Sequence, residues 1–153
     1  MRNLNLVTFD DSNKHLAASY IDLVEKNYTH EFFPGLPQHY LKEKRQDFVI
    51  CLLENYQKDD EEMIAITYGY SLWGWIYIHT LWVQENYKSE GIGSDLIKEV
   101  EELAASRKCH GIHLNTSTKK NVEFYTKNGF QIHGTLEDYP LGHCQYYLSK
   151  RLA

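Results

Sequence analysis

One segment of the sequence combines residue types and spacing that suit the binding of a phosphate group. In WVQENYKSEGIGS (residues 82–94), an apolar stretch ends, a glycine-containing loop follows, and the clearest amphipathic helix pattern of the chain begins. Glycine lets the main chain approach a ligand closely, and the unbonded N–H groups at a helix N-terminus attract anions. The segment therefore predicts a cradle of main-chain N–H groups for a phosphate.

Two familiar nucleotide-binding motifs do not account for this segment. A dinucleotide-binding fingerprint needs a third Gly or Ala where Leu96 stands, and no GxxxxGK[ST] motif occurs in the chain. A glycine turn that only starts a helix stays open as the alternative, because short glycine patterns recur by chance.

The elements that must position the loop follow from the periodicity of apolar residues. Strands are predicted at 4–9, 48–53, two within 63–83 separated at Trp73-Gly74, 111–116, 130–136 and 145–149. Helices are predicted from the capping residues Asp10, Asp11 and Ser12 to about Asn27, near 39–45, at 94–108 and at 121–127. Hairpins in the first half and crossovers in the second predict an α/β fold, a mixed sheet with helices on both faces.

Length and composition narrow the classes of protein. The 153 residues predict a single domain, 1–153. A net charge of −5 disfavours nucleic acid as a partner. No apolar run is long enough to cross a membrane and the first residues lack the apolar core of a signal peptide, so a cytoplasmic location is expected. Three widely spaced cysteines are expected to be reduced thiols.

The loop and a second motif resemble those of the GNAT superfamily of N-acetyltransferases. The superfamily pattern (Gln/Arg)-x-x-Gly-x-(Gly/Ala) reads here as KSEGIG (residues 88–93), and VEFYTKNGF (residues 122–130) is similar to the later helix with its tyrosine. The resemblance covers about residues 61–150. Two residues depart from the usual pattern: Lys88 replaces a planar donor, and Glu90 places a negative charge in the loop.

This resemblance implies a fold and a co-substrate. The fold would be a mixed, mostly antiparallel sheet that splays between its fourth strand, which ends at Val83, and its fifth strand, 111–116. Acetyl-CoA would bind as co-substrate without a metal, its pantetheine arm lying along the fourth strand. The implied cofactor-binding residues are Leu81, Trp82, Val83, Lys88, Ser89, Glu90, Gly91, Ile92, Gly93, Ser94, Asn115, Asn121 and Tyr125.

The chemistry of acetyl transfer needs a proton acceptor and a group near the leaving sulfur. An alkylammonium with a pKa near 10.4 costs roughly 4 to 5 kcal/mol to deprotonate at neutral pH. His79 is the candidate base, directly or through water, because an imidazole titrates near pH 7. Strand alternation predicts that Tyr77, His79, Leu81 and Val83 share one face. By the resemblance, Tyr125 would steady the departing sulfur. A strand histidine and a packing tyrosine stay open as alternatives.

The expected acceptor is the primary amine of a small cationic molecule, attacked directly in a ternary complex. Carboxylates and aromatic rings suit such a group, and the candidate acceptor-binding residues are Glu31, Phe32, Tyr77, His79, Tyr139 and His143. Two other functions are left open: a protein or peptide N-acetyltransferase, and an acyl-CoA sensor without catalysis. The oligomeric state is also open, a homodimer among the options.

Overall fold

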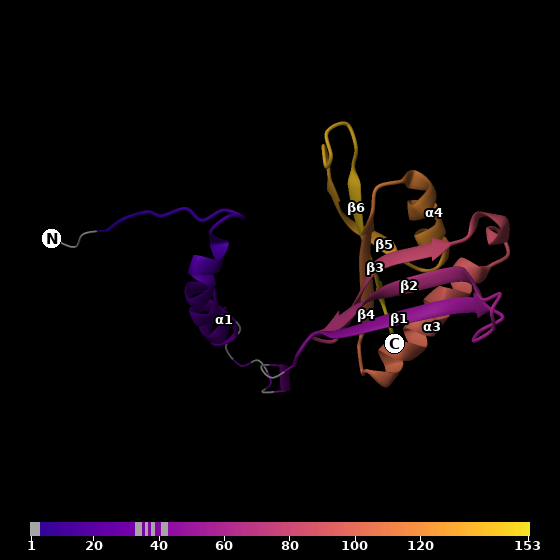
Figure 1. The fold of residues 1–153 in the computed structure, drawn as a ribbon, viewed down its shortest axis with the longest axis horizontal. Coiled ribbons are helices and arrows are strands. Elements are labelled where there is room, and N and C mark those ends of the chain that lie inside the picture. Colours follow the sequence, from indigo (N-terminus) through magenta and orange to yellow (C-terminus); the bar gives the residue numbers. More distant parts are fainter. Residues whose placement is uncertain (1–3, 33–34, 36, 38, 41–42) are drawn as a thin grey trace. The chain divides into compact units, whose positions relative to one another are not determined.

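The computed structural model describes the chain apart from residues 1–3, 33–34, 36, 38 and 41–42, and it describes only the main chain of residues 26–32. The chain divides into two compact units, Met1–Glu43 and Lys44–Ala153, which are described separately (Figure 1).

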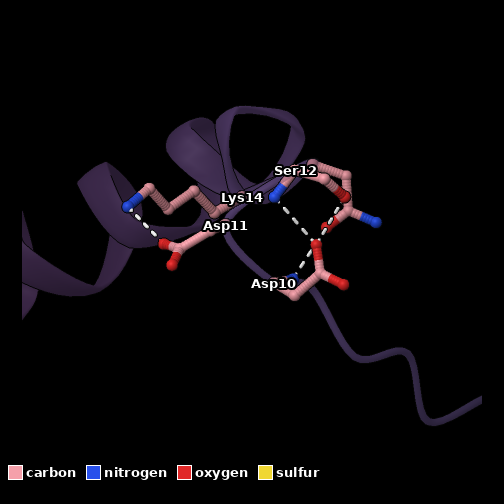
Figure 2. Close-up of polar contacts among 5 residues, drawn as sticks. Asp10, Asp11, Ser12 and Lys14 are labelled. Carbon is pink, nitrogen blue, oxygen red and sulfur yellow. Dashed lines mark hydrogen bonds and ion pairs between the residues drawn. The ribbon is translucent and has the colours of Figure 1, made fainter.

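The first unit consists of an aspartate turn and a helix. Asp10 accepts hydrogen bonds on Oδ1 from the Ser12 N–H and from Ser12 Oγ, and Lys14 pairs with Asp11 (Figure 2). The bonds from Ser12 hold the pKa of Asp10 below its ordinary value. The turn leads into a 3-10 turn, Lys14–Ala17, and then α1, Ala18–Phe32. The predicted helix is confirmed, but it continues to Phe32 instead of ending at about Asn27. The cap residue of the 3-10 turn is Asn13, whose side chain makes no capping hydrogen bond.

Two predictions for this unit need correction or fall outside the description. The strand predicted at 4–9 is wrong: these residues have no regular secondary structure and the Leu6 side chain is fully exposed. Alternation alone does not make a strand when no neighbouring strand supplies hydrogen bonds. In the helix predicted near 39–45, His39 and Tyr40 are helical, residues 41–42 lie outside the described residues, and residues 43–45 are irregular.

The second unit is built on a six-stranded sheet with the order β1-β2-β3-β4-β6-β5. Its strands are β1 (Gln46–Glu54), β2 (Glu62–Leu72), β3 (Trp75–Val83), β4 (Gly111–Thr116), β5 (Gln131–Leu136) and β6 (Gln145–Arg151). Every neighbouring pair is antiparallel except β3 and β4. The mixed, mostly antiparallel sheet is confirmed, including the division of the long apolar stretch at Trp73-Gly74, where both residues have positive φ.

The parallel pairing between β3 and β4 is short, and the two strands separate beyond it. β3 and β4 are in register only from Trp75 opposite Gly111 to Ile78 opposite Leu114. β3 continues for five residues beyond this point while paired with β2. The predicted splay between the strand that ends at Val83 and the strand 111–116 is therefore present.

Two helices cover one face of this sheet. α3 (Ile92–Ser106) and α4 (Lys119–Lys127) bury their apolar residues in one core with the strands. The core includes Ile76, Ile112 and Leu148 from three neighbouring strands. Helices on the opposite face stay a prediction. Among the described residues, no helix combines the length and apolarity needed to span a membrane.

Candidate functional site

The glycine loop presents a run of unbonded main-chain donors. In the described part of the chain, the N–H groups of residues 89–94 donate no hydrogen bond to other main-chain atoms, and helical bonding resumes where the Asp95 N–H donates to the Gly91 carbonyl. Gly91 takes a left-handed conformation, φ +85°, directly before α3. Six successive free N–H groups at a helix N-terminus can bind an anion without any side chain.

These donors border a cavity of ≈ 750 Å³ between the loop, the end of β3 and α4. This is enough space for a large organic ligand. The cavity is lined by Leu81, Val83, Tyr87, Lys88, Ser89, Gly91, Ile92, Gly93, Ser94, Thr118, Lys120, Asn121, Glu123, Phe124 and Lys127.

Close packing explains the second glycine of the loop. A Cβ at Gly93 would lie 3.0 Å from the Phe124 ring, whereas one at Gly91 would meet nothing within 4 Å. Gly93 is therefore required by the proximity of α4, and Gly91 by its backbone conformation.

The structure brings most of the predicted cofactor residues to the cavity, but not all of them. Trp82, Glu90, Asn115 and Tyr125 do not line it. Glu90 is exposed, so solvent and salt screen the loop's extra negative charge. Of the α4 residues that line the cavity, only Asn121 was predicted from the sequence. The available signal was the Thr118 cap, whose Oγ1 accepts a hydrogen bond from the Asn121 N–H and fixes the start of α4.

Charge around the cavity is predominantly positive. Three lysines and one carboxylate, Glu123, line it. Lys88 is also paired with Glu85, and this ion pair lowers the pKa of Glu85. The chain is acidic as a whole, but the side chains around the cavity carry a net positive charge, which suits the binding of an anion.

The end of β3 offers unpaired main-chain groups to the same region. Residues 80–83 pair with β2 on one edge, while the edge toward β4 has no strand partner after Ile78. Such an edge can hydrogen-bond an extended ligand. Leu81 and Val83 place this edge directly beside the cavity.

A β-bulge changes which way the β3 side chains point. Thr80 pairs with Tyr68 and Ile78 with Gly69, so His79 is an extra residue without a partner. Ile78 lies in the core, and Leu81 contacts the same core after the bulge. The prediction that Tyr77, His79, Leu81 and Val83 share one face is therefore wrong, because an extra residue reverses the alternation.

Tyr77 and His79 lie on the face opposite the cavity. The rings of Tyr77 and His79 are 6.3 Å apart, and His79 stacks on Tyr68 at 5.3 Å. His79 Nδ1 lies 3.0 Å from Thr80 Oγ1. Burial raises the pKa of Tyr77, whose hydroxyl donates to Asn115 Oδ1 at 2.8 Å.

Tyr125 belongs to α4 and is buried in the core. Its side chain is 7% exposed and its ring contacts those of Phe124 and Phe130. Burial raises its pKa to about 12. Among the described residues, the Tyr125 hydroxyl has no hydrogen-bond partner. It is a neutral donor over the whole physiological pH range.

The remaining acceptor candidates lie on other elements. Glu31 and Phe32 end α1, and their side chains are outside the described part of the structure. Tyr139 and His143 belong to the loop between β5 and β6, both exposed, and the Tyr139 N–H donates to the His143 carbonyl. Tyr139 and His143 do not line the cavity.

Comparison with known proteins identifies the family. The model of the acetyltransferase (GNAT) family matches residues 17–130. An acetyltransferase of Agrobacterium fabrum, Atu2258, is 30% identical over 95 residues, which are 62% of this chain and 69% of that protein. Blasticidin-S acetyltransferase of Streptomyces morookaense is 31% identical over 85 residues, 55% of this chain and 62% of that protein.

A solved structure agrees on the fold. The crystal structure of an acetyltransferase from Bacillus cereus superposes with a TM-score of 0.75 at 24% identity, covering 99% of this chain and 98% of that one. The chain belongs to the acetyltransferase (GNAT) family, and it is an acyltransferase that uses acetyl-CoA.

Proposed function

We propose that the chain transfers the acetyl group of acetyl-CoA to the primary amine of a small cationic molecule, by direct attack in a ternary complex. The observation that carries the proposal is the continuity of one cavity from the free N–H groups of residues 89–94 to the unpaired edge of β3. A diphosphate and an extended amide chain need these two kinds of group, and acetyl-CoA carries both.

The cavity residues divide the binding of acetyl-CoA between them. The N–H groups of residues 89–94 bind the diphosphate, supported by the positive end of α3 and by lysines such as Lys120 and Lys127. The main chain of residues 81–83 pairs with the amides of the pantetheine arm. This arrangement directs the thioester toward the splay, where a group on the opposite face can reach it.

The residues on either side of the splay have separate roles in the transfer. Acetyl-CoA supplies an activated acetyl group. The amine nitrogen forms a bond to the carbonyl carbon, the carbon–sulfur bond breaks, and the amine proton passes to His79 or to a water held by it. The His79 tautomer whose Nδ1–H donates to Thr80 leaves Nε2 as the acceptor. The neutral Tyr125 hydroxyl donates a hydrogen bond to the departing thiolate rather than a full proton, because its pKa is about 12.

Two features support a small cationic acceptor. A relative that is 31% identical is a blasticidin-S acetyltransferase. The face of the sheet that carries His79 is rich in aromatic rings, including Tyr68, Tyr70 and Tyr77, which attract an amine cation. In the proposal, Tyr77 and His79 contact the acceptor, and Glu31, Phe32, Tyr139 and His143 are the further candidates.

A thiol-release assay tests this function. Purified protein is incubated with acetyl-CoA and a panel of polyamines, aminoglycosides, amine-bearing nucleosides and lysine-rich peptides. The proposal expects release of free CoA with one group of small amines. Release only with peptides would make the chain a peptide N-acetyltransferase. Calorimetric binding of CoA without release from any amine would make it a sensor.

The base is tested through the pH dependence of turnover. His79→Ala should lower kcat/KM and flatten the acid limb of its pH profile, because the group that must be unprotonated is gone. His15→Ala, on the turn before α1, serves as control and should leave the profile unchanged. An unaltered acid limb in His79→Ala would remove His79 from this role.

A further inference from the structure

Three polar side chains meet at the point where β3 and β4 separate. Tyr77 lies one residue before the last paired residue of β3, and Asn115 lies one residue after the last paired residue of β4. The Tyr77 hydroxyl reaches across this final pair and donates to Asn115 Oδ1 at 2.8 Å. Asn115 Nδ2 in turn donates to Gln145 Oε1, the first residue of β6, at 3.1 Å.

This hydrogen-bonded chain lies away from the cofactor cavity. Ile112 and Leu114 are buried in the core beneath α3 and α4, so Asn115, one residue further on, points to the opposite face. Asn115 does not line the cavity, and its amide uses both its acceptor and a donor within the protein. All three side chains are half-buried, which limits competition from water.

We propose that Tyr77, Asn115 and Gln145 form a clamp that fixes the spacing of β3 and β4 at the splay, and that they act as positioning residues for acetyl transfer. A parallel pair with only four residues in register has few hydrogen bonds to hold its open end. The clamp crosses the last of these pairs and ties both strands to β6. Its effect on catalysis rests on the proposed function, whereas its effect on the strands does not.

Amide hydrogen exchange and kinetics together test the clamp. Tyr77→Phe, which removes one hydrogen bond, should speed exchange in peptides covering residues 76–83 and 112–116 about tenfold. Asn115→Leu, which removes the bonds to both Tyr77 and Gln145, should speed exchange in the same peptides at least as much. Tyr70→Phe is the matched control, because its ring lies 5.3 Å from that of Tyr77 on the same face and its hydroxyl is outside the chain of bonds. It should leave exchange unchanged.

The kinetic measurements separate positioning from binding. Each clamp variant should lower kcat about tenfold, because a small displacement of one reacting group slows transfer by at least this much. The calorimetric Kd for acetyl-CoA should stay the same. The double variant should be no slower than Asn115→Leu, because Asn115→Leu already breaks the bond that Tyr77→Phe removes. Gln145→Leu keeps the bond between Tyr77 and Asn115, so its kcat should lie between that of the wild type and that of Asn115→Leu. It replaces Asn115→Leu in these measurements if that variant fails to fold.

Two results would overturn the clamp. One is unchanged exchange at the splay in both Tyr77→Phe and Asn115→Leu. The other is a weaker Kd for acetyl-CoA in Asn115→Leu alone, which would make Asn115 a direct contact of the cofactor. If the wild-type protein acetylates no amine while the variants still exchange faster, the clamp stands and the proposed function fails.

Discussion

Burial decides what Tyr125 can do. A phenol enclosed by Phe124 and Phe130 loses the hydration that would stabilise its anion, so its pKa rises to about 12. A thiol is a stronger acid than such a phenol, and complete proton transfer from Tyr125 to a thiolate would run uphill. The residue is suited to donating a hydrogen bond, which stabilises charge on sulfur without changing its own protonation state.

Removing this hydroxyl gives a kinetic prediction. Tyr125→Phe should reduce kcat about tenfold or more through the loss of one charge-assisted hydrogen bond in the transition state. Acetyl-CoA affinity, measured by calorimetry, should change little because the substitution leaves the N–H groups that bind the diphosphate unchanged. Tyr56→Phe, on the hairpin between β1 and β2, is the control. Unchanged turnover in Tyr125→Phe would leave the residue only a packing role.

The raised pKa of Tyr125 also makes the free energy of unfolding depend on pH in the alkaline range. Between pH 10 and pH 12 the unfolded chain loses the Tyr125 proton and the folded chain keeps it, so the free energy of unfolding falls as pH rises. Over two pH units this amounts to roughly 3 kcal/mol. Denaturant unfolding at stepped pH should therefore show a steeper alkaline loss for the wild type than for Tyr125→Phe. Parallel curves for the two proteins would mean that the phenol is already hydrated in the fold.

At the scale of elements, one glycine permits the bulge that separates the two faces of the site. Gly69 lies on β2 opposite the bulge, where a Cβ would be 1.9 Å from the Tyr77 carbonyl oxygen and 3.1 Å from the His79 nitrogen. Only a residue without a side chain allows β3 to crowd β2 in this way. The bulge in turn directs His79 to one face while Leu81 and Val83 line the cavity on the other.

Substitution of Gly69 should therefore disrupt both the bulge and the site. We expect Gly69→Ala to lower the free energy of unfolding by about 3 kcal/mol, because main-chain atoms rather than a flexible side chain must move. Gly134→Ala is a close control, since Gly134 also lies beside a bulge but its Cβ would meet only Tyr147 Cβ at 3.9 Å. Equal losses in the two variants, measured by denaturant unfolding, would contradict the crowding at Gly69.

Local patterns in the sequence predicted most elements of the second unit, and longer-range geometry accounts for what they missed. The helix at 94–108, the strand at 111–116 and the turn at Trp73-Gly74 depend on periodicity and turn residues within a few positions. The bulge at His79 depends on Gly69, which lies ten residues away on the neighbouring strand. The residues that α4 brings to the cavity depend on a packing contact between Phe124 and Gly93 that no local pattern contains.

At the scale of the whole molecule, the net charge and the local charge have opposite signs. The chain carries −5 overall, yet Lys88, Lys120 and Lys127 line the cavity beside the free N–H groups of the loop. Lys88 is partly neutralised by Glu85, so Lys120 and Lys127 are left to supply most of the attraction for an anion. Binding of a multiply charged cofactor should then depend strongly on ionic strength, because exposed charges are screened within about 10 Å at 0.1 M salt.

This screening gives a prediction for the protein as a whole. Raising the salt from about 0.05 M to about 0.5 M should weaken acetyl-CoA binding about fivefold to tenfold, measured by calorimetry. The variant Lys120→Gln/Lys127→Gln should bind more weakly at low salt and lose most of this dependence, since its neutral amides leave little charge to screen. Lys58→Gln, at the acidic hairpin tip, removes one charge far from the loop in sequence. Its acetyl-CoA affinity should depend on salt concentration as strongly as that of the wild type. If the affinity of all three proteins fell equally with salt concentration, the main-chain donors alone would bind the diphosphate. The two lysines would then contribute only to the long-range electrostatic field.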